Sequence, residues 1–201
     1  MLASKGEVLA AQASFRSNSD TILLGPGATK SAFERSAVDQ HSIIHLAVHA
    51  VANEKHPERA AIILLSDSSS GDDGILEASN IVHLHINADL VVLSACDTAV
   101  GRLQGEEGIA NLSLAFQLAG AKTVVSTLWS IDDTRALDLM KRFYAHLAEK
   151  DTVAHAMTAA KRDMLKNYGR QAVPYYWASF KLEGPGDHAI SLNSKKFSAR
   201  K

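Results

Sequence analysis

Short apolar runs alternate with helical patterns along the chain, and this alternation sets the predicted fold. Residues 90–93 are apolar and β-branched, which is typical of a strand buried on both faces in the middle of a parallel sheet. Residues 42–50 have the same character, and we expect a second strand there that ends at His49. Similar runs predict further strands at residues 21–24, 60–65, 123–128 and 174–182.

In most of the segments between these runs, apolar residues recur at helical spacing. Gly120 closes one such pattern, as glycine often does at a helix end. The predicted helices cover residues 7–15, 30–38, 75–82, 109–119, 137–147 and 153–165. Strands alternating with helices predict an α/β fold with a mainly parallel sheet and helices on both faces. We expect a helical lead-in at residues 1–20, one domain at 21–184 and a flexible basic tail at 185–201.

Two chemically active residues follow the two apolar runs. Cys96 is the only cysteine of the chain, and it stands where the strand at residues 90–93 gives way to a loop. His49 ends the other run, 47 positions earlier. Sites in open α/β sheets form at the carboxyl ends of strands, and a neighbouring imidazole activates a thiol as a nucleophile. A buried structural cysteine and a histidine bonded to the backbone are the alternatives at these positions.

Several stretches, in a fixed order, carry a family resemblance. They are residues 44–49, 93–98, 105–110, 115–121, 124–133 and 175–178. In this order they resemble the CHAT domain, a caspase-like module of the clan that includes caspases, separases and gingipains. The resemblance covers about residues 20–184. It implies that His49 and Cys96 form a proteolytic dyad and that the backbone N–H groups of Ala50 and Cys96 hold the oxyanion.

Two departures from the family pattern bear on activity. The family usually has glycine directly after the histidine, where this chain has Ala50. Alanine keeps the N–H donor but does not reach positive φ cheaply, so a site that needs such a backbone would be misaligned. The first 20 residues are also shorter than the usual leading segment, and no helical repeat of about 34 residues is present. We therefore expect a partner, or another part of the protein, to complete an edge of the sheet. The resemblance also implies a tetratricopeptide-repeat region or a partner protein as an interaction partner.

Acidic and aromatic residues near the predicted strand ends are candidates for substrate binding. Several members of the clan bind a basic side chain with acidic residues, and Asp97, Asp132 and Asp133 stand in suitable positions. Asp132 and Asp133 also precede a predicted helix, and we favour a capping role for them. Trp129 is a candidate subsite wall, with packing as the favoured alternative.

Composition narrows the class of protein. The chain has 201 residues, 46% hydrophobic and 21% charged, which suits one globular domain. A formal net charge of −1 gives no global electrostatic reason to bind nucleic acid or membrane. We find no run of about 18 apolar residues and no signal-peptide core. One cysteine excludes an internal disulfide, so we expect a cytoplasmic protein.

Other chemistries fit the sequence less well. His41, His45 and His49 would need a helix to act together as metal ligands, and their β-branched surroundings predict a strand, so we expect neither metal nor cofactor. A serine hydrolase is disfavoured because the Gly-x-Ser-x-Gly elbow is absent. The sequence thus predicts a caspase-like cysteine endopeptidase that cleaves a protein substrate as the effector domain of a larger signalling protein. The alternative is a catalytically impaired scaffold that acts as a protein-interaction module.

Overall fold

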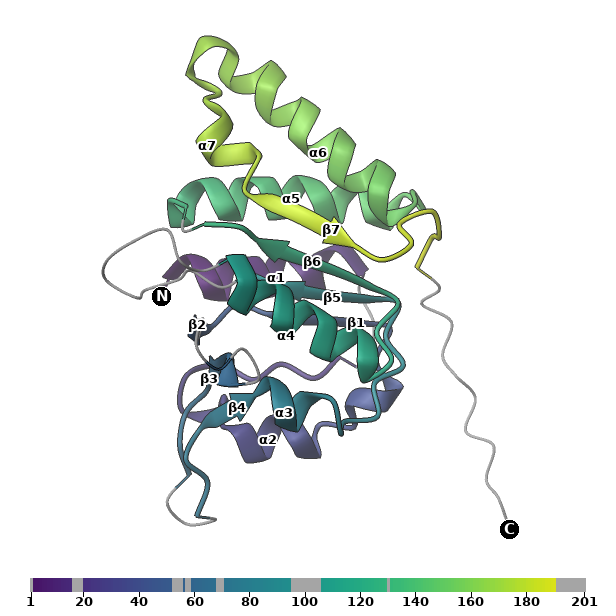
Figure 1. Cartoon of the computed structure of the whole chain (residues 1–201). Coiled ribbons are helices and arrows are strands. Elements are labelled where there is room, and N and C mark those ends of the chain that lie inside the picture. Colours follow the sequence, from purple (N-terminus) through teal and green to yellow (C-terminus); the bar gives the residue numbers. More distant parts are fainter. Residues whose placement is uncertain are drawn as a thin grey trace.

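The computed structural model describes residues 2–15, 20–51, 56, 59–67, 71–94, 106–129 and 131–190 (Figure 1). The side chains of residues 2, 3 and 106–110 are not among those described.

The main sheet has the strand order β1-β5-β6-β7. Its strands are β1 (Ile43–Leu46), β5 (Leu90–Leu93), β6 (Thr123–Thr127) and β7 (Phe180–Glu183). The first three run parallel and β7 runs antiparallel to β6. Every residue of β5 and β6 is buried, as expected for strands in the middle of a sheet covered on both faces.

A smaller antiparallel sheet follows directly from β1. It has the order β2-β3-β4, formed by β2 (His49–Val51), β3 (Ala61–Ile63) and β4 (Ile75–Glu77). The chain therefore leaves the main sheet after Leu46 and starts a new strand at His49 within three residues.

Helices cover both faces of the main sheet (Figure 1). One face packs against α5 (Asp133–Ala148) and α6 (Val153–Tyr168), with α1 (Leu2–Phe15) lying along α5. The other face packs against α2 (Lys30–Arg35), α3 (Ala78–Ile81) and α4 (Glu106–Leu118).

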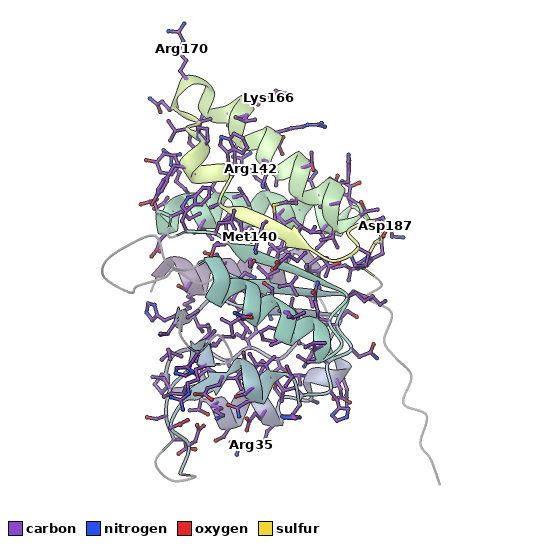
Figure 2. The ribbon with its side chains drawn as sticks, in the orientation of Figure 1. Arg35, Met140, Arg142, Lys166, Arg170 and Asp187 are labelled. Carbon is purple, nitrogen blue, oxygen red and sulfur yellow. The ribbon has the colours of Figure 1, made fainter. Side chains whose placement is uncertain are left out.

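The alternation of side chains along β5 divides the core in two. Val91 and Leu93 belong to the cluster beneath α4, whereas Leu90 and Val92 belong to the cluster beneath α5. Met140 of α5 is buried in the second cluster, while Lys166 and Arg170 extend outward near the end of α6 (Figure 2). These facts confirm an α/β fold with a mostly parallel sheet and helices on both faces.

Short elements complete the chain. The single-turn helices are η1 (Gly25–Gly27), η2 (Val38–Gln40), η4 (Gly169–Gln171) and α7 (Pro174–Trp177). Gly120 follows α4 with φ near 114°, and a Cβ there would clash with the carbonyl oxygen of Ile86. The predicted end of that helix is therefore confirmed, because only glycine fits this backbone.

Two predicted strands are wrong in part. The single strand expected over residues 42–50 is broken, because the chain turns after Leu46 to pair with β3. The strand expected over residues 174–182 begins with α7, in which Pro174 occupies the first turn and suits a helix start. Only from Phe180 does this segment pair with β6.

Two further predictions fail for related reasons. Residues 75–82 were expected to form one helix, but the first three pair with β3 and only then does α3 begin. Glu77 and Asn80 form a capping box at that switch. Residues 21–24 form no strand in the structure; the backbone runs directly into η1 at Gly25–Gly27.

Within the described part of the chain, no helix is both long enough and apolar enough to cross a membrane.

Candidate active site

One row of paired residues defines the carboxyl end of the three parallel strands. Leu46 of β1 is opposite Leu93 of β5, and Leu93 is opposite Ser126 of β6. The Ser94 N–H donates to the Leu46 carbonyl at 3.0 Å, so the pairing of β1 and β5 continues to the strand ends. This row is the reference level from which the candidate residues are placed.

Each of three candidate residues comes three positions after a member of that row. His49 follows Leu46, Cys96 follows Leu93, and Trp129 follows Ser126. Because the strands are neighbours and parallel, all three end at the same edge of the sheet. Cys96 and Asp97 themselves belong to residues 95–105, which lie outside the described residues.

His49 is the first residue of β2, and it is exposed. Its neighbour Ala50 is buried, and Val51 is exposed again. Because successive residues of a strand point to opposite faces, the imidazole points away from the side that Ala50 buries. His45 lies on β1, in a different strand from His49.

A small apolar hollow lies on the buried side of this strand exit. It is lined by Leu46, Val48, Ala50, Ile62, Leu93, Leu112 and Thr127. These side chains come from the ends of β1, β5 and β6, from β2 and β3, and from α4. The strand ends therefore pack against apolar side chains on one side, while the imidazole of His49 lies on the side exposed to solvent.

The backbone of Ala50 is free of the strain that its sequence position suggested. Among the described residues other than glycine, positive φ occurs at Ala37 and Lys150. Ala50 lies instead in the extended backbone of β2 and is 5% exposed. An alanine after the histidine therefore fits this conformation without a left-handed residue.

Trp129 stacks on an aromatic residue from the far end of the chain. Its indole N–H donates to the carbonyl oxygen of Tyr175 at 2.9 Å, and the two ring centroids are 6.1 Å apart at 23°. Tyr175 is 51% exposed and also meets Tyr176 edge-on. Sequence reasoning missed Tyr175 because the segment was expected to be a strand, although its aromatic composition was visible.

An arginine holds the other side of this aromatic group. The guanidinium of Arg135 lies 4.0 Å from the ring centroid of Tyr168 and 5.3 Å from that of Tyr176. Such cation–π contacts fix the rings relative to α5. The aromatic group beside the strand ends is therefore anchored at both sides.

The two acidic candidates before α5 act at the helix start. Asp132 is the N-cap, and its Oδ1 accepts hydrogen bonds from the N–H groups of Thr134 and Arg135. Asp133 is the first residue of the helix and is exposed. The described residues contain no group of three or more His, Cys, Asp or Glu side chains that could hold a metal ion.

Comparison with known proteins agrees with this architecture. The model of the CHAT domain family matches residues 1–185. Tetratricopeptide repeat protein 28 of Mus musculus is 28% identical over 130 residues, which is 65% of this chain and 5% of that protein. The chain thus spans about one twentieth of the length of this relative. With the family model matched over nearly its whole length, the chain belongs to the CHAT domain family, which is caspase-like.

Proposed function

We propose that this domain is a caspase-like cysteine endopeptidase in which His49 and Cys96 form the catalytic dyad. The observation that carries the proposal is the common row Leu46–Leu93–Ser126 at the ends of adjacent parallel strands. In the sequence, His49 comes three positions after the last residue of β1, and Cys96 comes three positions after the last residue of β5. Because these strands end at one edge of the sheet, we expect the thiol and the imidazole to lie close together, which is the first requirement for nucleophilic catalysis.

The chemistry proceeds in two steps. The thiolate of Cys96 attacks the carbonyl carbon of the scissile peptide bond, and His49 gives a proton to the departing amine as the C–N bond breaks. The product is a thioester on Cys96. Water then attacks the thioester while His49 accepts its proton, which releases the carboxylic acid and restores the thiol.

Backbone N–H groups at Ala50 and Cys96 are the proposed oxyanion donors. The extended conformation of Ala50 supports the use of its N–H without backbone strain. An oxyanion donor of this kind typically contributes about a hundred- to a thousand-fold in rate.

The aromatic pair Trp129–Tyr175 is the proposed wall of a substrate subsite. It lies beside the third strand exit, is partly open to solvent, and is held in place by the indole hydrogen bond. Asp97 and Asp133 are proposed to contribute negative charge toward a basic substrate side chain. Asp132 has a structural role as the helix cap, and a contribution to binding would come in addition to it.

Mutation of the dyad tests the proposal directly. A proteome-derived peptide library is incubated with the wild type and the variants Cys96→Ala and His49→Ala, and new peptide ends are detected by mass spectrometry. We expect cleavage by the wild type and its loss in both variants while circular dichroism stays unchanged. His83→Ala is the matched control, because His83 is an exposed histidine in the segment that leads to the amino end of β5.

The opposite outcome has a clear meaning. Undiminished cleavage by Cys96→Ala would end the dyad proposal. A wild type that binds peptides at this edge without cutting them would favour the scaffold alternative, in which the domain serves as a protein-interaction module.

The biological setting is part of the same proposal. The mouse relative is named a tetratricopeptide repeat protein, and it is far longer than this chain. We therefore propose that the domain acts as the effector part of a larger protein. A tetratricopeptide-repeat region or a partner protein would then control the access of substrates to the site.

A further inference from the structure

The N-terminal helix is attached to the domain in a different way from the other long helices. Helix α5 buries six side chains and α6 buries five, nearly all of them apolar. Among the described side chains of α1, the buried one is a carboxylate, that of Glu7, at 4% exposure. The attachment of α1 therefore depends on a polar group where apolar residues would be usual.

Glu7 belongs to a buried row of three polar side chains from three elements. Its Oε2 lies 3.4 Å from Nε2 of His45 on β1, and each side chain is 5% exposed. Nδ1 of His45 lies 2.5 Å from the hydroxyl oxygen of Tyr144 on α5, which is fully buried. The row thus links α1 through the edge of the sheet to the central helix on that face.

Protons can be assigned along this row from its surroundings. Burial, and then the nearby carboxylate of Glu7, raise the pKa of Tyr144 well above its ordinary value. The hydroxyl therefore keeps its proton and donates it to Nδ1 of His45, which leaves the imidazole proton on Nε2. Nε2 of His45 faces the Glu7 carboxylate at 3.4 Å, a close approach in which neither of these two atoms has a hydrogen-bond partner among the described residues.

The apolar side chains of α1 that the structure describes are at most partly buried. Phe15 meets Tyr144 edge-on, with ring centroids 6.1 Å apart, and Ala11 is partly buried against the same core. At Gly6 the helix approaches α5 closely, since a Cβ there would lie 3.1 Å from Leu137. Glycine is a poor residue inside a helix, so α1 gains little from its own propensity.

We propose that α1 is a latch helix: it undocks as a separate unit while the sheet stays folded, and the Glu7–His45–Tyr144 row sets how often it does so. Among the described side chains of α1, no apolar one is fully buried, and one buried polar row must re-form each time the helix docks. His45 lies on β1, the strand whose exit carries His49, so the docked latch also holds the edge of the candidate site.

Hydrogen exchange of the intact chain, followed by mass spectrometry, tests this inference. In the wild type we expect the amides of α1 to exchange through a smaller opening than those of β5 and β6. Glu7→Ala removes the carboxylate that faces the buried Nε2 of His45 at 3.4 Å, so we expect exchange in α1 to rise about tenfold or more while β5 and β6 change little. Glu7→Gln keeps an acceptor oxygen and is expected to have a smaller effect.

Controls separate the latch from general destabilisation. Gln12→Ala truncates an exposed side chain of the same helix and should leave its exchange within about twofold of the wild type, since surface changes have small effects. In the background of His45→Ala, the added effect of Glu7→Ala should shrink, because the two residues act as a pair.

Three results would overturn the inference. The first is exchange of α1 only together with β5 and β6 in the wild type. The second is no change in α1 on Glu7→Ala. The third is an equal effect of Gln12→Ala. If Glu7→Ala fails to fold, the wild-type comparison and Glu7→Gln still decide between a latch and a single cooperative unit.

Discussion

At position 50 the chain has alanine where the family usually has glycine, and the local backbone accommodates alanine without strain. Glycine usually follows the histidine in this family, and its replacement suggested a strained or misaligned site. The residue lies in an extended strand, with its neighbours His49 and Val51 exposed and its own side chain turned to the apolar hollow. The methyl group therefore packs, and the N–H keeps its place in an ordinary strand.

Replacement of Ala50 by glycine gives the first prediction. The change removes one packed methyl group and adds backbone freedom to the unfolded chain, so we expect the free energy of unfolding to fall by about 1 kcal/mol. Urea denaturation followed by circular dichroism measures it. Val51→Ala, at an exposed position of the same strand, is the control. Increased stability in Ala50→Gly would show that alanine is strained there after all.

The carboxylate of Asp72 gives a prediction on pH. It accepts hydrogen bonds from the Gly74 N–H and from both the N–H and the hydroxyl of Ser31, and these bonds hold its pKa below the ordinary value of 3.8. A depressed folded pKa means that the unfolded chain takes up the proton first. This contribution to stability is therefore complete well above pH 3.8 and is lost as the pH falls through the folded pKa.

The measurement is urea unfolding at pH 5.5 and at pH values from about 4 down to 2.5. We expect the loss of stability on acidification to be smaller in Asp72→Ala than in the wild type, because the variant lacks this group. The same slope in both proteins would show that Asp72 does not contribute.

At the scale of elements, the sequence predicted best where burial alone decides the structure. Residues 90–93 are a continuous apolar run, residues 123–127 are β-branched apart from Ser126, and both segments are strands buried throughout. The helices α5 and α6 were found because their apolar side chains recur at helical spacing over four turns. Such patterns lie within one segment, so they can be recognised without knowing which other segment packs against it.

The secondary-structure predictions failed where pairing with another segment of the chain determines the structure. Residues 42–50 look continuous, and only their pairing with β3 shows that the strand breaks after Leu46. Residues 75–77 are helix-compatible, yet they pair with β3. The aromatic run after Pro174 reads as a strand by composition, but its first turn is helical. Propensity is a weak guide in such short segments.

Asp132 gives the prediction at this scale. As the N-cap of α5 it accepts two backbone hydrogen bonds, so Asp132→Ala should lower the free energy of unfolding by about 1 kcal/mol. Asp132→Asn keeps a capping oxygen and should be nearly as stable as the wild type. Chemical denaturation of the three proteins gives the comparison. If cleavage of basic substrates falls in the asparagine variant while its stability is unchanged, the carboxylate also serves in binding.

At the scale of the whole molecule, the order β1-β5-β6 brings the ends of three distant strands to one edge. This adjacency, on which the proposed pairing of His49 with Cys96 rests, could be predicted from the sequence because parallel strands place their carboxyl ends together. Tyr175 and the Glu7–His45–Tyr144 row could not, since these contacts join segments more than 35 positions apart with no periodic signal between them. Their positions follow from the packing of α1, α5 and α7.

Titration of the single cysteine tests the central claim most directly. The chain has one cysteine, so the rate of alkylation by iodoacetamide as a function of pH reports on Cys96 alone. A thiol without assistance has a pKa of about 8.5. We predict a midpoint well below that value in the wild type and a return toward it in His49→Ala, with no change in His83→Ala. A wild-type midpoint at or above about 8.5, unaltered by His49→Ala, would contradict the dyad.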